Sequence, residues 1–189
     1  MKGNGFFVNP PVRWSWSRIT KKWKCFTGQY KHQSKEKSMK ISDYLKEHAC
    51  QMNLSAQNKE EAIREIAGSL NSGGEINEQE AFIRDILERE SLGSTGIGHG
   101  VAIPHSRTDS VDGFLIGFGK SSSGVDFSAL DGEPVHLIFL MGANPQELNL
   151  YLRLLAELSK LLMDAAFRRE LMAAEKSSDI IALFQKFES

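Results

Sequence analysis

One histidine in this sequence lies among side chains that suit phosphoryl transfer. His105 belongs to the stretch "STGIGHGVAIPHSR", residues 94–107. The unperturbed pKa of imidazole is about 6.5, so near pH 7 a histidine is a neutral nucleophile that can accept a phosphoryl group and pass it on. Hydroxyl and guanidinium groups that could bind the phosphoryl oxygens stand close by in the sequence: Ser94, Thr95, Ser106, Arg89 and Arg107. These residue types indicate a nucleophilic histidine with fixed cations around it.

The backbone next to His105 also suits such a site. We predict a strand over residues 101–103 with the histidine at its end, and Pro104 stiffens that end. Alternating glycines before the strand would let backbone N–H groups approach an anion closely: Gly96, Gly98 and Gly100. From these residues alone, a histidine that only ends a strand remains the alternative.

Other kinds of site fit the spacing poorly. "GIGHG" lacks the GK[ST] ending of a phosphate-binding P-loop, and its glycines precede a strand, whereas those of the dinucleotide fingerprint follow one. His99 and His105 are six residues apart, which is not the helical i, i+4 pair of a zinc site. His136 lies in an apolar run, where we expect a structural histidine with one hydrogen bond. We therefore expect no metal and no cofactor.

Charge divides the chain into a basic arm and an acidic body. Residues 1–38 hold nine of the 23 Lys/Arg and one of the 24 Asp/Glu, a net charge of +8, which leaves −9 for the rest. All three tryptophans lie in this arm, without helical or strand periodicity. We interpret residues 1–38 as an extension that is disordered or not native to the domain. An arm that binds a membrane surface or nucleic acid is the alternative.

Cysteine usage and hydropathy bear on the compartment. Cys25 and Cys50 form neither a disulfide framework nor a zinc-ligand pattern, which fits a reducing cytosol. No apolar run reaches the roughly 18 residues that a membrane span needs, and the N-terminus lacks the apolar core of an export signal. We expect a cytoplasmic protein without membrane insertion or bound nucleic acid.

From residue 39 onward, apolar periodicity predicts an α/β domain. Amphipathic helices are expected over 58–74 and 78–90, the second starting at Asn77 with Glu80 as its partner. Strands are expected over 101–103, 114–119 and 134–143, and the near-continuous apolar run of the last predicts a central strand. A long helix begins at Asn144, and shorter helices follow near 165–174 and 178–187. This order favours a small mixed β-sheet with helices on both sides.

Three blocks of the sequence resemble one protein family. "RESLGSTGIGHGVAIPHSR" (89–107) is similar to the active-site segment of the IIA domain of the fructose/mannitol/nitrogen class in the bacterial phosphoenolpyruvate-dependent phosphotransferase system. The similarity continues in "GVDFSALDGEPVHLIFLMGA" (124–143) and "LRLLAELSKLLMDAAFRRELMAA" (152–174). It covers residues 39–189, which we take as one EIIA type-2 domain, and excludes the arm.

The resemblance implies roles for individual residues. His105 would be phosphorylated on Nε2, and Arg89 would be the cation next to the phosphate. The phosphoryl donor would be an HPr-type phosphocarrier protein, with no nucleotide or metal required. Many relatives carry a second histidine where Tyr151 stands here. A tyrosine can donate a hydrogen bond at pH 7 but cannot carry a proton as imidazolium does. We expect Tyr151 at the rim of the His105 site, with a core aromatic as the alternative.

Two functions fit this family. In the first, the domain is a nitrogen-type regulator, and phosphorylation of His105 switches its binding to target proteins. In the second, it is the IIA component of a fructose/mannitol-type sugar permease and passes the phosphoryl group to a IIB domain. Since one domain takes up residues 39–189, no IIB or IIC segment accompanies it in this sequence, which favours the regulator. A homodimer is compatible with both.

Overall fold

A computed structural model describes residues 39–189, and the predicted extension over residues 1–38 lies outside them. The strands of the described part are β1 (Cys50–Gln51), β2 (Gly96–Gly98), β3 (Val101–Ala102), β4 (His105–Arg107), β5 (Phe114–Val125) and β6 (Val135–Ala143). They form one mixed sheet in the order β1–β5–β6–β3–β2, and β4 also pairs with β6.

Strand β6 lies at the centre of the sheet, as its apolar sequence predicts. Strand β5 pairs with it antiparallel on one side, while β3 and β4 pair with it parallel on the other. Every residue of β6 except His136 is buried. Strand β5 runs six residues beyond its predicted end at residue 119. The buried Lys120 continues this strand because its Nζ donates to the backbone carbonyls of Met172 and Ala174.

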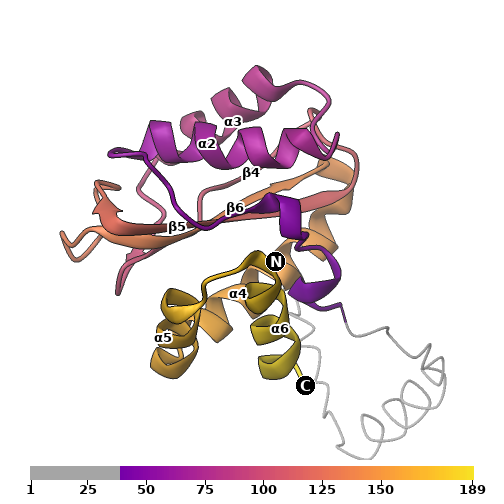
Figure 1. Ribbon diagram of the computed structural model, residues 1–189. Helices are drawn as coiled ribbons and strands as arrows, with labels where there is room; N and C mark the ends of the chain where they lie inside the picture. Colours follow the sequence, from indigo (N-terminus) through magenta and orange to yellow (C-terminus); the bar gives the residue numbers. More distant parts are fainter. Residues whose placement is uncertain (1–38) are drawn as a thin grey trace, which may run out of the picture. The chain divides into compact units, whose positions relative to one another are not determined.

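Helices cover both faces of the sheet (Figure 1). Helices α2 (Lys59–Ser72) and α3 (Gln79–Ser91) lie on one face, and α4 (Leu148–Met163), α5 (Ala165–Ala173) and α6 (Ser177–Phe187) lie on the other. Along β6, Ile138 and Leu140 belong to the core under α2 and α3, whereas Leu137 and Phe139 belong to the core under α4 to α6. The predicted α/β architecture, a mixed sheet with helices on both sides, is confirmed.

Short 3-10 turns lead into and connect these elements. Turns η1 (Ile41–Asp43) and η2 (Glu47–Ala49) precede β1. After β6, the Asn144 side chain accepts the N–H of Gln146, and Pro145 begins the turn η3 (Pro145–Glu147) that leads into α4. The first turn of α4 therefore follows directly from the carboxyl end of β6.

The predicted N-cap of the second helix, Asn77, is wrong by one residue. Helix α3 begins at Gln79 with Glu78 as its N-cap and no side-chain cap. Asn77 instead donates its backbone N–H to the Ser110 carbonyl, so its backbone pairs with the segment before β5. The Glu80 carboxylate, expected to cap the helix, receives Arg64 Nη1 at 2.9 Å.

Pro104 divides the predicted strand over 101–103 from the histidine. Strand β3 ends at Ala102, and His105 begins the separate strand β4. Between them the Ile103 N–H donates to the Thr95 carbonyl at 3.1 Å, and the Pro104 carbonyl accepts the N–H of Met141 at 2.9 Å. Since proline has no N–H of its own, the pairing with β6 breaks here and resumes at His105.

Candidate active site

His105 lies where the end of the sheet meets the start of α4. Strand β4 pairs in parallel with the last residues of β6, with His105 opposite Met141. Helix α3 approaches the same place, because its C-terminal residues lead through the 92–95 loop into β2. The imidazole is half-buried. Side chains from α3, β4 and α4 can therefore converge on this ring.

A backbone carbonyl determines which nitrogen of the His105 ring carries the proton. His105 Nδ1 lies 2.6 Å from the Ile103 carbonyl oxygen. Because a carbonyl only accepts hydrogen bonds, Nδ1 is the protonated nitrogen and Nε2 keeps its lone pair. Burial lowers the pKa of His105 below its ordinary value of 6.5, and the charge of Arg89 lowers it further. The ring is therefore neutral at pH 7, with Nε2 as its nucleophilic atom.

Two arginines direct positive charge at this site. Arg89, in the last turn of α3, donates from Nη1 to the Gly93 carbonyl at 3.1 Å. Its charge lowers the pKa of both His105 and Tyr151, and the charge of Arg107 lowers that of Tyr151. The Arg107 guanidinium has no hydrogen-bond or ion-pair partner within residues 39–189. Arg89 is thus close enough to act on both the His105 and the Tyr151 side chains, and Arg107 on that of Tyr151.

The structure places Tyr151 beside His105. Its ring centroid lies 6.1 Å from that of the histidine, with an angle of 57° between the planes. Tyr151 is 7% exposed on the inward face of α4, so it is also a core aromatic. Burial raises the pKa of its hydroxyl, which stays protonated at neutral pH. Because this hydroxyl bonds to no other described residue, it remains free to donate to a phosphoryl oxygen.

Glu90 is a buried charge of the site that the sequence reasoning missed. Its carboxylate accepts the backbone N–H of Thr95 at 2.9 Å and the Thr95 hydroxyl at 2.7 Å. Lys59 Nζ completes the cluster at 3.4 Å. A signal for this role exists, because Glu90 lies four residues after Ile86, on the buried stripe of α3. A charged residue on an apolar stripe needs a buried partner.

A chain of hydrogen bonds connects Glu90 to the histidine. The carboxylate holds Thr95, the Thr95 carbonyl accepts the N–H of Ile103, and the Ile103 carbonyl accepts Nδ1–H of His105. Thus the position of the imidazole depends on the loop that Glu90 fixes.

Ser94 and Thr95, predicted as phosphate ligands, have protein partners in this structure. The Ser94 hydroxyl donates to the Phe127 carbonyl at 2.8 Å, and that of Thr95 donates to Glu90. Each would have to leave its acceptor to bind a phosphoryl group, so that role stays a prediction. The alternating glycines serve the turn between β2 and β3, where Gly98 and Gly100 have φ of 91° and 73°. Their expected approach to an anion stays a prediction.

Ser106 and Arg107 face a pocket next to the histidine. The pocket has a volume of about 630 Å³ and is also lined by Arg89. The Ser106 hydroxyl has only a long contact of 3.4 Å, to the Arg107 carbonyl, and is available as a donor. Three carboxylates share the lining: Asp85, Glu88 and Asp109. The pocket thus has a lining of mixed charge, and His105 itself is not among its lining residues.

The remaining histidines are separate from this site. His136 donates one hydrogen bond from Nδ1 to the Ser121 carbonyl, at 2.9 Å, which is the single bond expected of a structural histidine. His99 has a φ of 55°, as its position between two glycines suggests. Within residues 39–189, no group of three or more His, Cys, Asp or Glu side chains could hold a metal ion. No helix of this part is long and apolar enough to cross a membrane.

Known proteins share this sequence and fold. The family model "Phosphoenolpyruvate-dependent sugar phosphotransferase system, EIIA 2" matches residues 43–187. The fructose-specific EIIABC component of Bacillus subtilis is 41% identical over 148 residues, which are 78% of this chain but only 23% of that protein. The nitrogen regulatory protein of Bradyrhizobium diazoefficiens is 31% identical over 145 residues, 77% of this chain and 94% of the relative.

Solved structures agree with these matches. The nitrogen regulatory protein IIA-Ntr of Neisseria meningitidis has a TM-score of 0.68 at 27% identity, covering 76% of this chain and 98% of that one. The mannitol IIA of Escherichia coli, solved in complex with phosphorylated IIB, shares the fold, with a TM-score of 0.64 at 24% identity, covering 75% and 99%. With the match over residues 43–187, these likenesses show that the chain belongs to the EIIA 2 family of the phosphoenolpyruvate-dependent sugar phosphotransferase system.

Proposed function

We propose that this domain carries a phosphoryl group on Nε2 of His105, received from an HPr-type phosphocarrier protein. The observation that supports this most strongly is the hydrogen bond from Nδ1 to the Ile103 carbonyl. It leaves Nε2 as the only nitrogen with a lone pair, in a ring whose pKa burial lowers. A neutral, oriented imidazole is what nucleophilic attack on phosphorus requires.

The transfer balances without a cofactor. The Nε2 lone pair forms a bond to phosphorus while the bond between phosphorus and the donor's histidine nitrogen breaks and returns its electron pair to the donor. His105 keeps its Nδ1 proton throughout, on the Ile103 carbonyl. Arg89 and Arg107 stabilise the anionic phosphoryl oxygens, and the Tyr151 hydroxyl donates to one of them. Ser106 adds a further donor at the pocket side.

Phosphorylation then serves a nitrogen-type regulatory role. It adds roughly two negative charges beside two arginines, which changes what the surface around His105 binds. Similarity to nitrogen regulatory proteins over nearly their whole length supports this role. The second candidate is transfer onward to a IIB domain of a fructose/mannitol-type permease, which the 41% identity to the fructose-specific EIIABC component favours.

Mass spectrometry tests the phosphorylation of His105 and the transfer of its phosphate to a IIB domain. The purified chain is mixed with phosphoenolpyruvate, enzyme I and an HPr-type carrier, and we expect a gain of one phosphate that is labile in acid and stable in alkali. His105→Ala should gain none, whereas His48→Gln, a control at an exposed histidine, should label fully. Labelling of a folded His105→Ala protein would overturn the proposal. Adding a fructose-type IIB domain separates the two roles, since only a transfer component loses its phosphate to IIB rapidly.

A further inference from the structure

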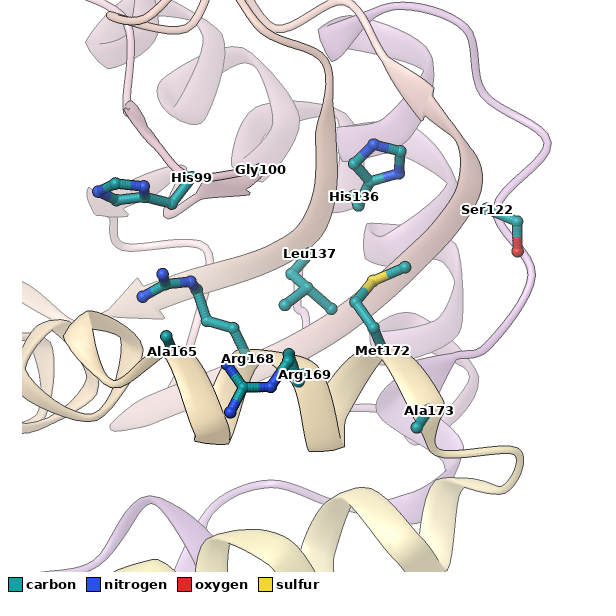
Figure 2. A pocket seen from close by; sticks show the side chains of 10 residues that line it. All are labelled: His99, Gly100, Ser122, His136, Leu137, Ala165, Arg168, Arg169, Met172 and Ala173. Atoms are coloured by element: carbon teal, nitrogen blue, oxygen red, sulfur yellow. The ribbon is translucent and has the colours of Figure 1, made fainter.

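A second pocket lies at the other end of β6, away from His105. It has a volume of about 690 Å³ and is lined by residues of β5, the β2–β3 turn, the start of β6 and α5 (Figure 2). On β6, His136 is the first residue that lines this pocket. His105 pairs with Met141, which lies five residues further along the same strand. At about 3.3 Å for each strand residue, the two sites are roughly 17 Å apart. No residue lines both pockets.

The side chains of this pocket are basic or apolar. Its lining includes two histidines and two arginines and not one carboxylate: His99, His136, Arg168 and Arg169. This contrasts with the pocket beside Ser106, where three acids accompany the arginines. The carboxylate nearest to His99 belongs to Asp131, which already accepts the backbone N–H groups of His99 and Glu133. The pocket therefore has an excess of positive charge.

The cations of the pocket keep donors free. Arg168 uses Nη1 for the Leu162 carbonyl at 2.7 Å, which leaves Nε and Nη2 for a ligand. Its side chain reaches from α5 toward the His99 ring in Figure 2. Arg169 is exposed and has no hydrogen-bond or ion-pair partner among residues 39–189. Arg168 from α5 and His99 from the β2–β3 turn thus line one pocket that no carboxylate lines.

His99 has a backbone conformation that residues other than glycine rarely adopt. Its φ is 55°, and the flanking Gly98 and Gly100 also have positive φ. Backbone strain of this kind is concentrated at functional and ligand sites. The hydrogen bond from its N–H to Asp131, 2.9 Å long, fixes the turn that presents the imidazole. A strained turn that a hydrogen bond holds in place supports a binding role for the His99 imidazole.

We propose that this pocket binds a small phosphomonoester. The phosphate would lie between Arg168 and His99, where a forked guanidinium and an imidazole suit its oxygens. The organic part of the ligand would pack on the apolar side chains that line the pocket centrally, Leu137 and Met172. A volume of about 690 Å³ lies within the range of small-ligand pockets. This site is independent of phosphorylation at His105.

Binding of glucose 6-phosphate to the whole chain, with glucose and inorganic phosphate as partial ligands, tests the proposal. In titrations followed by backbone amide NMR, we expect shifts at Gly100, Ala165 and Ala173, and weaker binding of both partial ligands. His99→Asn keeps a residue that tolerates positive φ and removes the imidazole, and Arg168→Gln removes the guanidinium. Each should weaken glucose 6-phosphate binding about tenfold, the scale of one charge-assisted hydrogen bond.

The matched control is Lys160→Gln, which removes the same charge from an exposed side chain of α4. It should bind glucose 6-phosphate as the unchanged protein does. Equal affinity in the His99→Asn and control proteins would overturn the proposal, because the His99 imidazole would then contribute nothing to binding. So would equal binding of glucose, or no binding at about 1 mM, the upper end of ordinary metabolite affinities. His99→Asn keeps the test valid if Arg168→Gln unfolds, since His99 is exposed.

Discussion

The Glu90 carboxylate offers a sharp test of how the His105 ring is held. Glu90→Gln keeps the shape of the side chain and removes its charge. Two short hydrogen bonds to the carboxylate are affected: Thr95 N–H to Oε1 at 2.9 Å and Thr95 Oγ1 to Oε2 at 2.7 Å. The amide oxygen of glutamine can accept the first as a neutral bond, whereas its NH2 group must donate to the Thr95 hydroxyl in place of accepting from it. A hydrogen bond to a charged group contributes about 1.5–3 kcal/mol and a neutral one about 0.5–1.5 kcal/mol. The expected loss of unfolding free energy is therefore about 2 kcal/mol, and the loss of the Lys59 partner adds to it.

A loss of this size is measurable by thermal unfolding. For a chain of this length, 1 kcal/mol corresponds to about 2–4 °C, so the melting temperature should fall by about 4–8 °C. Glu88→Gln is the matched control, since it makes the same change on an exposed carboxylate two residues away. We expect no measurable fall for the control. If the two variants melt at the same temperature, Glu90 does not stabilise the 94–95 loop as described.

The same variant has a readout at the histidine. The negative charge of Glu90 raises the pKa of His105, so Glu90→Gln should lower that pKa further. Nitrogen NMR of the imidazole follows both this pKa and the protonated nitrogen. We expect a smaller population with the proton on Nδ1, because the Thr95–Ile103 connection loosens. An unchanged pKa and tautomer in a destabilised protein would show that the hydrogen-bond chain does not orient the ring.

Four further predictions concern the proposed transfer. Arg89→Gln should slow phosphorylation by about tenfold or more in a rapid-quench assay, the scale of one lost charge-assisted bond, and an unchanged rate would remove its role. Tyr151→Phe should slow it a few-fold to about tenfold, because only a neutral hydrogen bond is lost; a purely structural tyrosine would leave the rate unchanged. Burial depresses the pKa of His105, so protons bind the unfolded chain more tightly, and the protein should lose stability as pH falls from about 6.5 toward the folded pKa; urea unfolding should show this slope in the wild type and not in His105→Gln. A chain starting at Met39 should fold and accept phosphate at the normal rate, and aggregation would assign residues 1–38 to the domain.

The sequence predicts the layers of the fold well because their signals are local. The apolar run of β6 marks a strand buried on both faces, and the stripe of α2 marks a helix on the sheet. The grouping of His105, Arg89 and Tyr151 depends instead on three distant elements, and only the family resemblance connected them. The sequence also does not show that the Thr95 hydroxyl, a predicted phosphate ligand, donates to Glu90. Likewise, Pro104 was read as stiffening one strand, whereas its missing N–H divides two.

The acceptor that selects the nucleophilic nitrogen of His105 is a main-chain carbonyl, that of Ile103. No side chain encodes this acceptor, so a substitution at position 103 changes the packing around the histidine and still leaves a carbonyl in place. A substitution of Ile103 therefore does not remove the hydrogen bond that keeps the proton on Nδ1 of His105. A substitution of Pro104 can move the Ile103 carbonyl away from the ring, because Pro104 sets the direction of the backbone between the two short strands. The tautomer of His105 with its proton on Nδ1 therefore depends most directly on Pro104, a residue with no proposed contact to the phosphoryl group.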